Sequence, residues 1–105
     1  MIKQNKILGL LGISTKAGKL IFGTDSCMEA IKNKKTYIII VATDASERTK
    51  KHFTEACKQY NIPIAICSNI NELSKSIGKV NKAVIGIKDK NLANEISKYV
   101  FGGEQ

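Results

Sequence analysis

The stretch Lys19–Asp44, KLIFGTDSCMEAIKNKKTYIIIVATD, decides the fold of this chain. It predicts a short strand over 19–22, a glycine turn, a helix over about 25–34 and a buried strand over 37–42. The turn is expected at Gly23, because glycine adopts backbone angles that other residues avoid. The last strand is apolar without interruption, which is typical of a strand covered on both faces of its sheet.

The polar residues after the first strand form a candidate binding site. Thr24, Asp25 and Ser26 are all residues that cap helix starts, and Ser26 with Glu29 has the spacing of a capping box, with Ser26 at the cap. A glycine turn that leads into a helix also leaves several backbone N–H groups without partners, and such an end suits an anion. Capping alone is the competing explanation for these residues.

Composition indicates one small domain that attracts polyanions. A chain of 105 residues suffices for a single compact domain, so we expect residues 1–105 to form one. Its formal net charge is +8, from 17 basic and 9 acidic residues, which favours a nucleic-acid partner. A solvated lysine-rich surface and an acidic protein partner are the alternatives. No stretch approaches the roughly 20 apolar residues of a membrane span, so we expect no membrane partner and a cytoplasmic location.

No group of residues predicts catalysis. The odd number of cysteines, Cys27, Cys57 and Cys67, without a C-x-x-C pair, argues against a disulfide framework or a zinc site. The single histidine, His52, is expected at the surface. Gly12–Lys19 is similar to a P-loop but has five residues between its glycines where the motif needs four. We therefore expect no catalytic residue, metal, cofactor or small-molecule substrate.

The rest of the chain alternates between predicted helices and strands. Helices are expected over 2–16, about 44–60, about 69–78 and 91–101, and strands over 64–67 and 83–87, with fraying over 102–105. The apolar stripe of the first helix is predicted to comprise Ile2, Ile7, Leu8, Leu11 and Ile13. Asp44 with Glu47 is a second predicted capping box, and Ser68 or Asn69 caps the short helix. The alternation predicts an α/β fold with helices on both faces of a small sheet.

The same alternation predicts where the strands and loops lie. Buried strands linked by a helical crossover are expected to pair in parallel, whereas the strand over 19–22 is antiparallel or at an edge. Because loops at one edge of such a sheet cluster, we expect the turn at 23–26, Lys32 and the basic loop Lys79–Lys82 to form one phosphate-binding surface. The few aromatic residues outside the last helix look like core or helix-face residues, which favours folded RNA over stacked single strands.

The chain resembles the L7Ae/L30e family of kink-turn-binding ribosomal proteins, in particular its bacterial YlxQ branch. The resemblance covers nearly the whole chain and rests on four stretches: LLGISTKAGKLIFGTD, AIKNKKTYIIIVATDAS, NIPIAICS and ELSKSIGK. It implies a three-layer α/β/α sandwich with a four-stranded mixed sheet. It also implies binding to RNA kink-turns, in which sheared G·A pairs meet the family motif Gly-Thr-Asn-Glu-x-x-Lys.

The site residues that the resemblance implies match this motif in part. Gly23 and Thr24 match, whereas Asp25, Ser26 and Glu29 replace the Asn, Glu and Lys of the family. An aspartate keeps acceptor oxygens but lacks the amide donor, and Glu29 places a negative charge where the family has a positive one. Further site residues are Lys32, where the family often has a basic side chain, and Lys79, Val80, Asn81 and Lys82 of the second RNA-facing loop.

The leading hypothesis is therefore a small non-enzymatic protein that binds structured RNA, such as a kink-turn or ribosomal RNA, within a ribonucleoprotein. An alternative is a protein-interaction module in ribosome assembly or translation, with ribosomal or assembly proteins as partners and weakened RNA contacts. The substrate-binding half of an RNA-modifying enzyme ranks last.

Overall fold

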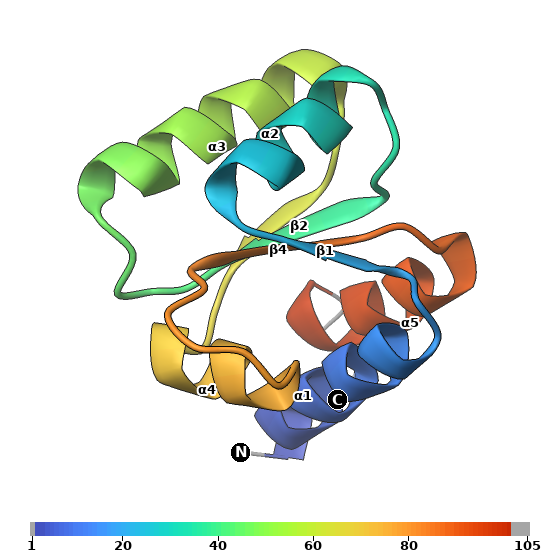
Figure 1. Cartoon of the computed structure of the whole chain (residues 1–105). Helices are drawn as coiled ribbons and strands as arrows, with labels where there is room; N and C mark the ends of the chain where they lie inside the picture. The colour runs from blue at the N-terminus through green and yellow to red at the C-terminus, as the bar shows by residue number, and fades with distance from the viewer. Residues whose placement is uncertain (1, 102–105) are drawn as a thin grey trace.

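The computed structural model describes the backbone of residues 2–101 and the side chains of residues 6–101, which form an α/β/α sandwich (Figure 1). The elements in chain order are α1 (Ile2–Lys16), β1 (Leu20–Phe22), α2 (Thr24–Lys32), β2 (Ile38–Val41), α3 (Glu47–Tyr60), β3 (Ile64–Ile66), α4 (Ile70–Ser76), β4 (Val84–Ile87) and α5 (Lys90–Val100). The predicted order of helices and strands is thus confirmed. The expected contribution of the Ile2 side chain and the expected fraying over 102–105 lie outside the described residues.

The four strands form one mixed sheet in the order β1-β4-β2-β3. Strand β4 pairs antiparallel with both β1 and β2, so that Gly86 faces Ile21 on one side and Ile39 on the other. Strands β2 and β3, which α3 connects, pair in parallel. The predicted parallel crossover is confirmed. Strand β1, expected to be antiparallel or at an edge, is both.

Helices cover both faces of the sheet. Helices α1, α4 and α5 lie on one face, and α2 and α3 lie on the other (Figure 1). Successive side chains of a strand point to opposite faces. Ile38 and Ile40 therefore pack in the first core, with Leu11, whereas Ile39 and Val41 pack in the second, with Phe53. All residues of β2 are fully buried, which explains why this strand contains no polar residue.

The predicted capping box of Asp44 with Glu47 is wrong. Ser46 caps α3, because its hydroxyl oxygen accepts a hydrogen bond of 3.1 Å from the Thr49 N–H. Asp44 lies two residues too early for this role, and its carboxylate instead accepts a hydrogen bond of 2.8 Å from the N–H of Ile70, at the start of α4. Asp44 therefore stabilises the start of α4 and does not cap α3.

The predictions that Ile13 and the strand over 64–67 are buried are also wrong. Ile13 is 54% exposed, because α-helical residues advance about 100° each, which turns it away from the buried Leu11. The strand predicted as buried over 64–67 is β3, in which only Ala65 is buried and Ile66 is 45% exposed. Strand β3 lies at the edge of the sheet, where a neighbouring strand covers one side only.

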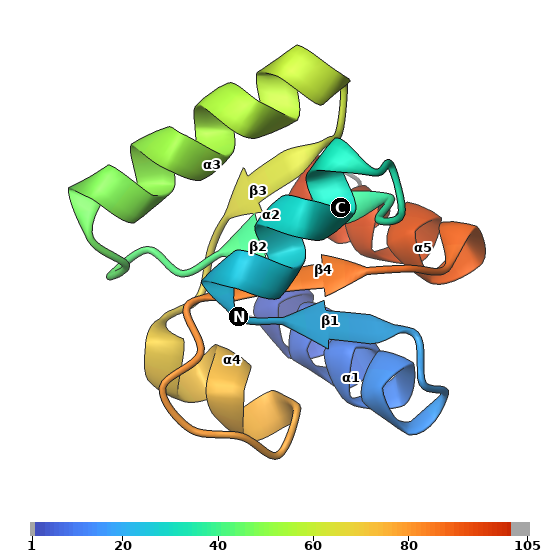
Figure 2. The ribbon, with the colours of Figure 1, turned by 45° about the horizontal axis from the view of Figure 1, so that its top comes forward.

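The strand directions bring four loops to one edge of the sheet. Strands β1, β2 and β3 end at this edge and β4 begins there, as their pairing requires. We call this edge the rim; it comprises residues 23–26, 43–46, 68–69 and 79–82 (Figure 2). Helices α2, α3 and α4 all start at the rim.

No helix within residues 2–101 is both long and apolar enough to cross a lipid bilayer.

Candidate nucleic-acid interface

The start of α2 is open to solvent at the centre of the rim. Gly23 precedes the helix with φ 95° and ψ 152°, a conformation that is essentially restricted to glycine. Its own N–H donates to the carbonyl of Val84 at 3.0 Å, which fixes the turn to β4. Because of this turn the helix already begins at Thr24, so the predicted capping box of Ser26 with Glu29 is wrong. Ser26 lies within the first helical turn instead of before it, and no side chain caps α2.

The first turn of α2 therefore presents unpaired donors. The Cys27 N–H is the first that bonds within the turn, to the Gly23 carbonyl at 3.1 Å. No described group accepts from the N–H groups of Thr24, Asp25 and Ser26, and all three residues are exposed. Such a helix end carries a partial positive charge that favours anions.

The basic loop Lys79–Lys82 lies beside this turn. The Nζ atoms of Lys79 and Lys82 lie 5.1 and 5.3 Å from the centroid of the Phe22 ring, which directly precedes Gly23. Both distances are within the range of cation–π attraction. Val80, between the two lysines, is 80% exposed. The predicted turn and the predicted loop thus share one exposed surface, which we call the turn–loop surface.

A buried serine fixes the shape of the basic loop. Ser74, in α4, is 2% exposed; its hydroxyl donates to the Lys82 carbonyl at 3.2 Å, and its oxygen accepts from the Lys82 N–H at 2.7 Å. Gly78 and Asn81 adopt positive φ angles of 72° and 57°. The backbone of the loop is therefore tied down at its end, while the Val80 side chain points outward.

Two predicted site residues lie away from the turn–loop surface. Lys32 is the last residue of α2, eight residues or about 12 Å along the helix axis from Thr24. Glu29 lines a hollow of about 310 Å³ with Ser26 on one flank of α2, where Lys35 and Lys88 also lie. The negative charge of Glu29 thus faces two lysines of its own chain.

The sequence reasoning missed the start of α3 as part of the rim. A hollow of about 400 Å³ lies beside Thr24 and is lined from α3 and its cap by Ser46, Arg48, Thr49, His52 and Phe53. The predicted strand directions could have indicated this position, because two strands that end at the same edge of a sheet place the helices that follow them side by side. Arg48, the only arginine in the sequence, is exposed there.

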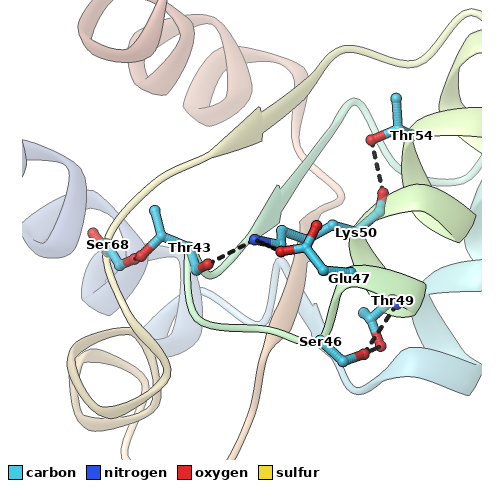
Figure 3. Close-up of polar contacts among 7 residues, drawn as sticks. All are labelled: Thr43, Ser46, Glu47, Thr49, Lys50, Thr54 and Ser68. Atoms are coloured by element: carbon cyan, nitrogen blue, oxygen red, sulfur yellow. Dashed lines mark hydrogen bonds and ion pairs between the residues drawn. The ribbon is translucent and has the colours of Figure 1, made fainter.

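Polar contacts hold the loops of the rim together (Figure 3). The Thr43 hydroxyl donates to the Ser68 carbonyl at 2.6 Å, which joins the loop after β2 to the loop after β3. The Lys50 Nζ donates to the Thr43 carbonyl at 2.9 Å and pairs with Glu47 at 3.1 Å. Lys50 is thus engaged within the protein, whereas Lys79 and Lys82 lie over the partly buried Phe22 ring.

The thiols do not form a reactive centre. Burial, and secondarily the neighbouring Cys57, raises the pKa of the Cys27 thiol to about 12, and burial raises that of Cys57 to about 11. Since the thiolate is the nucleophilic form, both groups are unreactive near pH 7. Within the part of the chain that the structure describes, no cluster of His, Cys, Asp and Glu could hold a metal ion.

Comparison with known proteins decides the family. The sequence profile of the Ribosomal protein L7Ae/L30e/S12e/Gadd45 family matches residues 5–97. The chain belongs to this family. The chain is 35% identical over 99 residues to RNA-binding protein YlxQ of Enterococcus faecium. These aligned residues make up 94% of this chain and 95% of the relative. RNA-binding protein YlxQ of Bacillus subtilis (strain 168) is 31% identical over 87 residues, 83% of this chain and 87% of the relative.

Solved structures confirm the fold expected for the L7Ae/L30e/S12e/Gadd45 family. A protein of unknown function from Bacillus halodurans C superposes with a TM-score of 0.88 at 32% identity, over 90% of this chain and 96% of the other. The Giardia lamblia 15.5kD RNA binding protein superposes with a TM-score of 0.82 at 20% identity, over 95% of this chain and 88% of the other. The second comparison supports the three-layer sandwich, and the two YlxQ proteins support the expected branch of the family.

Proposed function

We propose that this chain is a non-enzymatic RNA-binding protein that recognises a kink-turn in structured RNA, within a cytoplasmic ribonucleoprotein of the translation system. Membership of the L7Ae/L30e/S12e/Gadd45 family and the RNA-binding YlxQ relatives support the RNA partner. The net charge of +8 favours a polyanion for independent physical reasons.

The observation that carries this proposal is the turn–loop surface. Lys79 and Lys82 gather over Phe22, one residue before the turn that opens α2. Cationic side chains and unpaired helix N–H groups therefore face the same side, as a sharply bent RNA backbone requires. Recognition of folded RNA by shape suits such a surface better than base stacking on aromatic rings, since the ring of Phe22 is covered by the lysines.

Each part of the surface has a distinct role in this proposal. Lys79 and Lys82 contact phosphates, and the exposed Val80 packs on bases at the bend, with Asn81 holding the loop turn. Asp25 accepts from guanine N–H groups, and the free N–H groups of the first turn of α2 donate to RNA oxygens. Ser26 supplies a short hydroxyl where the family motif has a longer acid.

A mobility-shift titration tests kink-turn recognition directly. The probes are an RNA duplex with a kink-turn and the same duplex with its sheared G·A pairs replaced by Watson–Crick pairs. We expect the kink-turn to bind at least tenfold more tightly. Equal weak binding to both probes would refute specific recognition and leave only electrostatic attraction.

The salt dependence of binding tests the surface. We expect Lys79→Ala to weaken kink-turn binding and to flatten the slope of log K against log salt by about one unit, because one phosphate contact is lost. Lys58→Ala, which removes an exposed lysine on the outer side of α3, is the matched control. If the two variants bind alike, the turn–loop surface is not the contact.

A protein-interaction module in ribosome assembly or translation is a second candidate. Asp25, an exposed acid in the first turn of α2, favours it, because its negative charge would repel RNA phosphates there; Glu29 is a second exposed acid, on the flank of the same helix. Recovery of the same ribosomal or assembly proteins with the purified chain before and after nuclease treatment would support this function over RNA binding. Loss of all partners after nuclease treatment would exclude it.

A further inference from the structure

A groove leads from the rim along the seam between α2 and α3. The hollow of about 400 Å³ beside Thr24 and a second one of about 340 Å³ share the side chain of His52. The second hollow is lined by Met28, Lys32, His52, Glu55, Ala56, Gln59 and Tyr60. The two helices lie next to each other on one face of the sheet (Figures 1 and 2). We call the two hollows together the α2–α3 groove.

A cationic side chain lines each part of this groove, and a histidine lies between them. Arg48 lines the end at the rim, His52 lies one helical turn further on the same side of α3, and Lys32 lines the far part. The ion pairs found among the described residues involve other cations, Lys50 and Lys98. Glu55 is the only acid that lines either hollow. The charge of the groove therefore remains available to an anionic partner.

We propose that the α2–α3 groove binds the sugar–phosphate backbone of an RNA strand that leaves the turn–loop surface. This inference rests on the proposed function and extends it beyond the bend of the RNA. The groove begins at Thr24, so it is continuous with the turn–loop surface. It also gives a place to Lys32, which the structure separates from that surface.

The dimensions of the groove suit a short stretch of one strand. Thr24 and Lys32 are about 12 Å apart along α2. At the axial rise of one strand in a DNA double helix, about 3.4 Å per nucleotide, this length corresponds to three or four phosphates, and an extended single strand places fewer there. Arg48 and His52 are about 6 Å apart along α3, so successive side chains meet different phosphates.

Two RNAs separate binding in the groove from binding at the turn–loop surface. One is a minimal kink-turn duplex, and the other carries a single-stranded extension of six nucleotides at the strand end nearest to Thr24. Fluorescence anisotropy at about 0.1 M salt measures the affinity of each. The test variant is Lys32→Ala/Arg48→Ala, and the matched control is Lys51→Ala/Lys58→Ala, which removes the same charge from positions that line neither hollow. All four residues are exposed, so both variants should fold.

We expect the extension to increase the affinity of the wild type about fivefold, since it adds a small number of weak contacts between exposed charges. The test variant should lose this gain and about 1.4 units of salt slope, while its affinity for the minimal duplex stays within twofold of that of the control. If test and control variants behave alike with the extended RNA, the groove does not bind RNA. If the test variant binds both RNAs normally but no longer retains a co-purifying protein, the groove is a protein site, and the inference is also wrong. Failure of the proposed function is recognised separately, when Lys79→Ala leaves the affinity for the minimal duplex unchanged.

Discussion

The conformation of Gly23 predicts opposite effects for the same substitution at two glycines. Gly23 has φ 95° and ψ 152°, whereas Gly9 lies in the middle of α1. A Cβ atom added at either position meets no atom within 4 Å. Steric contacts with the rest of the protein are therefore equal in the two variants, and any difference between Gly23→Ala and Gly9→Ala reports the backbone alone.

The magnitudes follow from backbone energetics. An L-residue in the region that Gly23 occupies costs about 1–3 kcal/mol. Alanine in place of glycine within a helix, as at Gly9, gains about 0.5–1 kcal/mol, because glycine loses more chain entropy on folding. The free energies of unfolding of the two variants should thus differ by about 1.5–4 kcal/mol, with the wild type between them.

Urea unfolding followed by far-ultraviolet circular dichroism measures this difference. With an m-value of about 1–2 kcal/mol/M, the two midpoints should lie at least about 0.8 M apart. The m-values should agree, since neither substitution changes the surface that unfolding exposes. A Gly23→Ala variant as stable as the wild type would show that the turn does not have a positive φ, and the early start of α2 would then be wrong. A destabilised Gly9→Ala variant would show that α1 does not pass through this residue as a regular helix.

Three further predictions concern single side chains. Asp44→Ala should cost about 0.5–2 kcal/mol of unfolding free energy in urea titrations, because the Ile70 N–H loses its acceptor, and Asp44→Asn should restore most of it. Equal stability of wild type and Asp44→Ala would contradict the cross-loop contact. Phe22→Leu keeps an apolar side chain but removes two cation–π contacts of about 0.5–1 kcal/mol each, so kink-turn affinity in a mobility shift should fall by up to about five- to thirtyfold. An unchanged affinity would mean that the ring does not position the basic loop. Burial, and secondarily Cys57, raises the pKa of the Cys27 thiol from 9.0 to about 12. The unfolded chain therefore releases this proton at a lower pH than the folded chain does. The contribution of the thiol to stability is complete below pH 9 and is lost as the pH rises towards 12. Urea midpoints from pH 8 to about 10.5 should fall less steeply in Cys27→Ala, and parallel curves would show that the thiol is not desolvated.

Local sequence patterns predicted the elements and the general architecture. The apolar run that contains Ile38–Val41 shows no alternation, and only a strand between two helical layers buries every side chain in this way. The capping role of Asn69 was also predictable, since its side chain accepts from the Glu72 N–H within one helical turn. Local chemistry of this kind depends on neighbours in the chain, so a single sequence suffices to read it.

The tertiary structure alone decided which partner each ambiguous polar group takes. Asp44 is as good a cap as Ser46 by residue type, and only the position of α4 beside it shows that it binds Ile70. In the same way, Ile66 reads as a core residue, and only the strand order places it at an open edge. Sequence patterns specify which groups need a partner, but not which distant group comes within 3 Å.

The same distinction between local sequence and tertiary structure applies to the candidate site. The residue types at 23–26 and 79–82 indicated an anion-binding turn and a basic loop, because glycine, helix-capping residues and lysines have these properties in any context. Three other features depend on strand order and on helix packing. Lys79 and Lys82 meet at Phe22, Lys32 lies about 12 Å away from Thr24 along α2, and Arg48 lies beside Thr24. Such distances come from contacts between residues far apart in the chain, and local sequence carries no information about them.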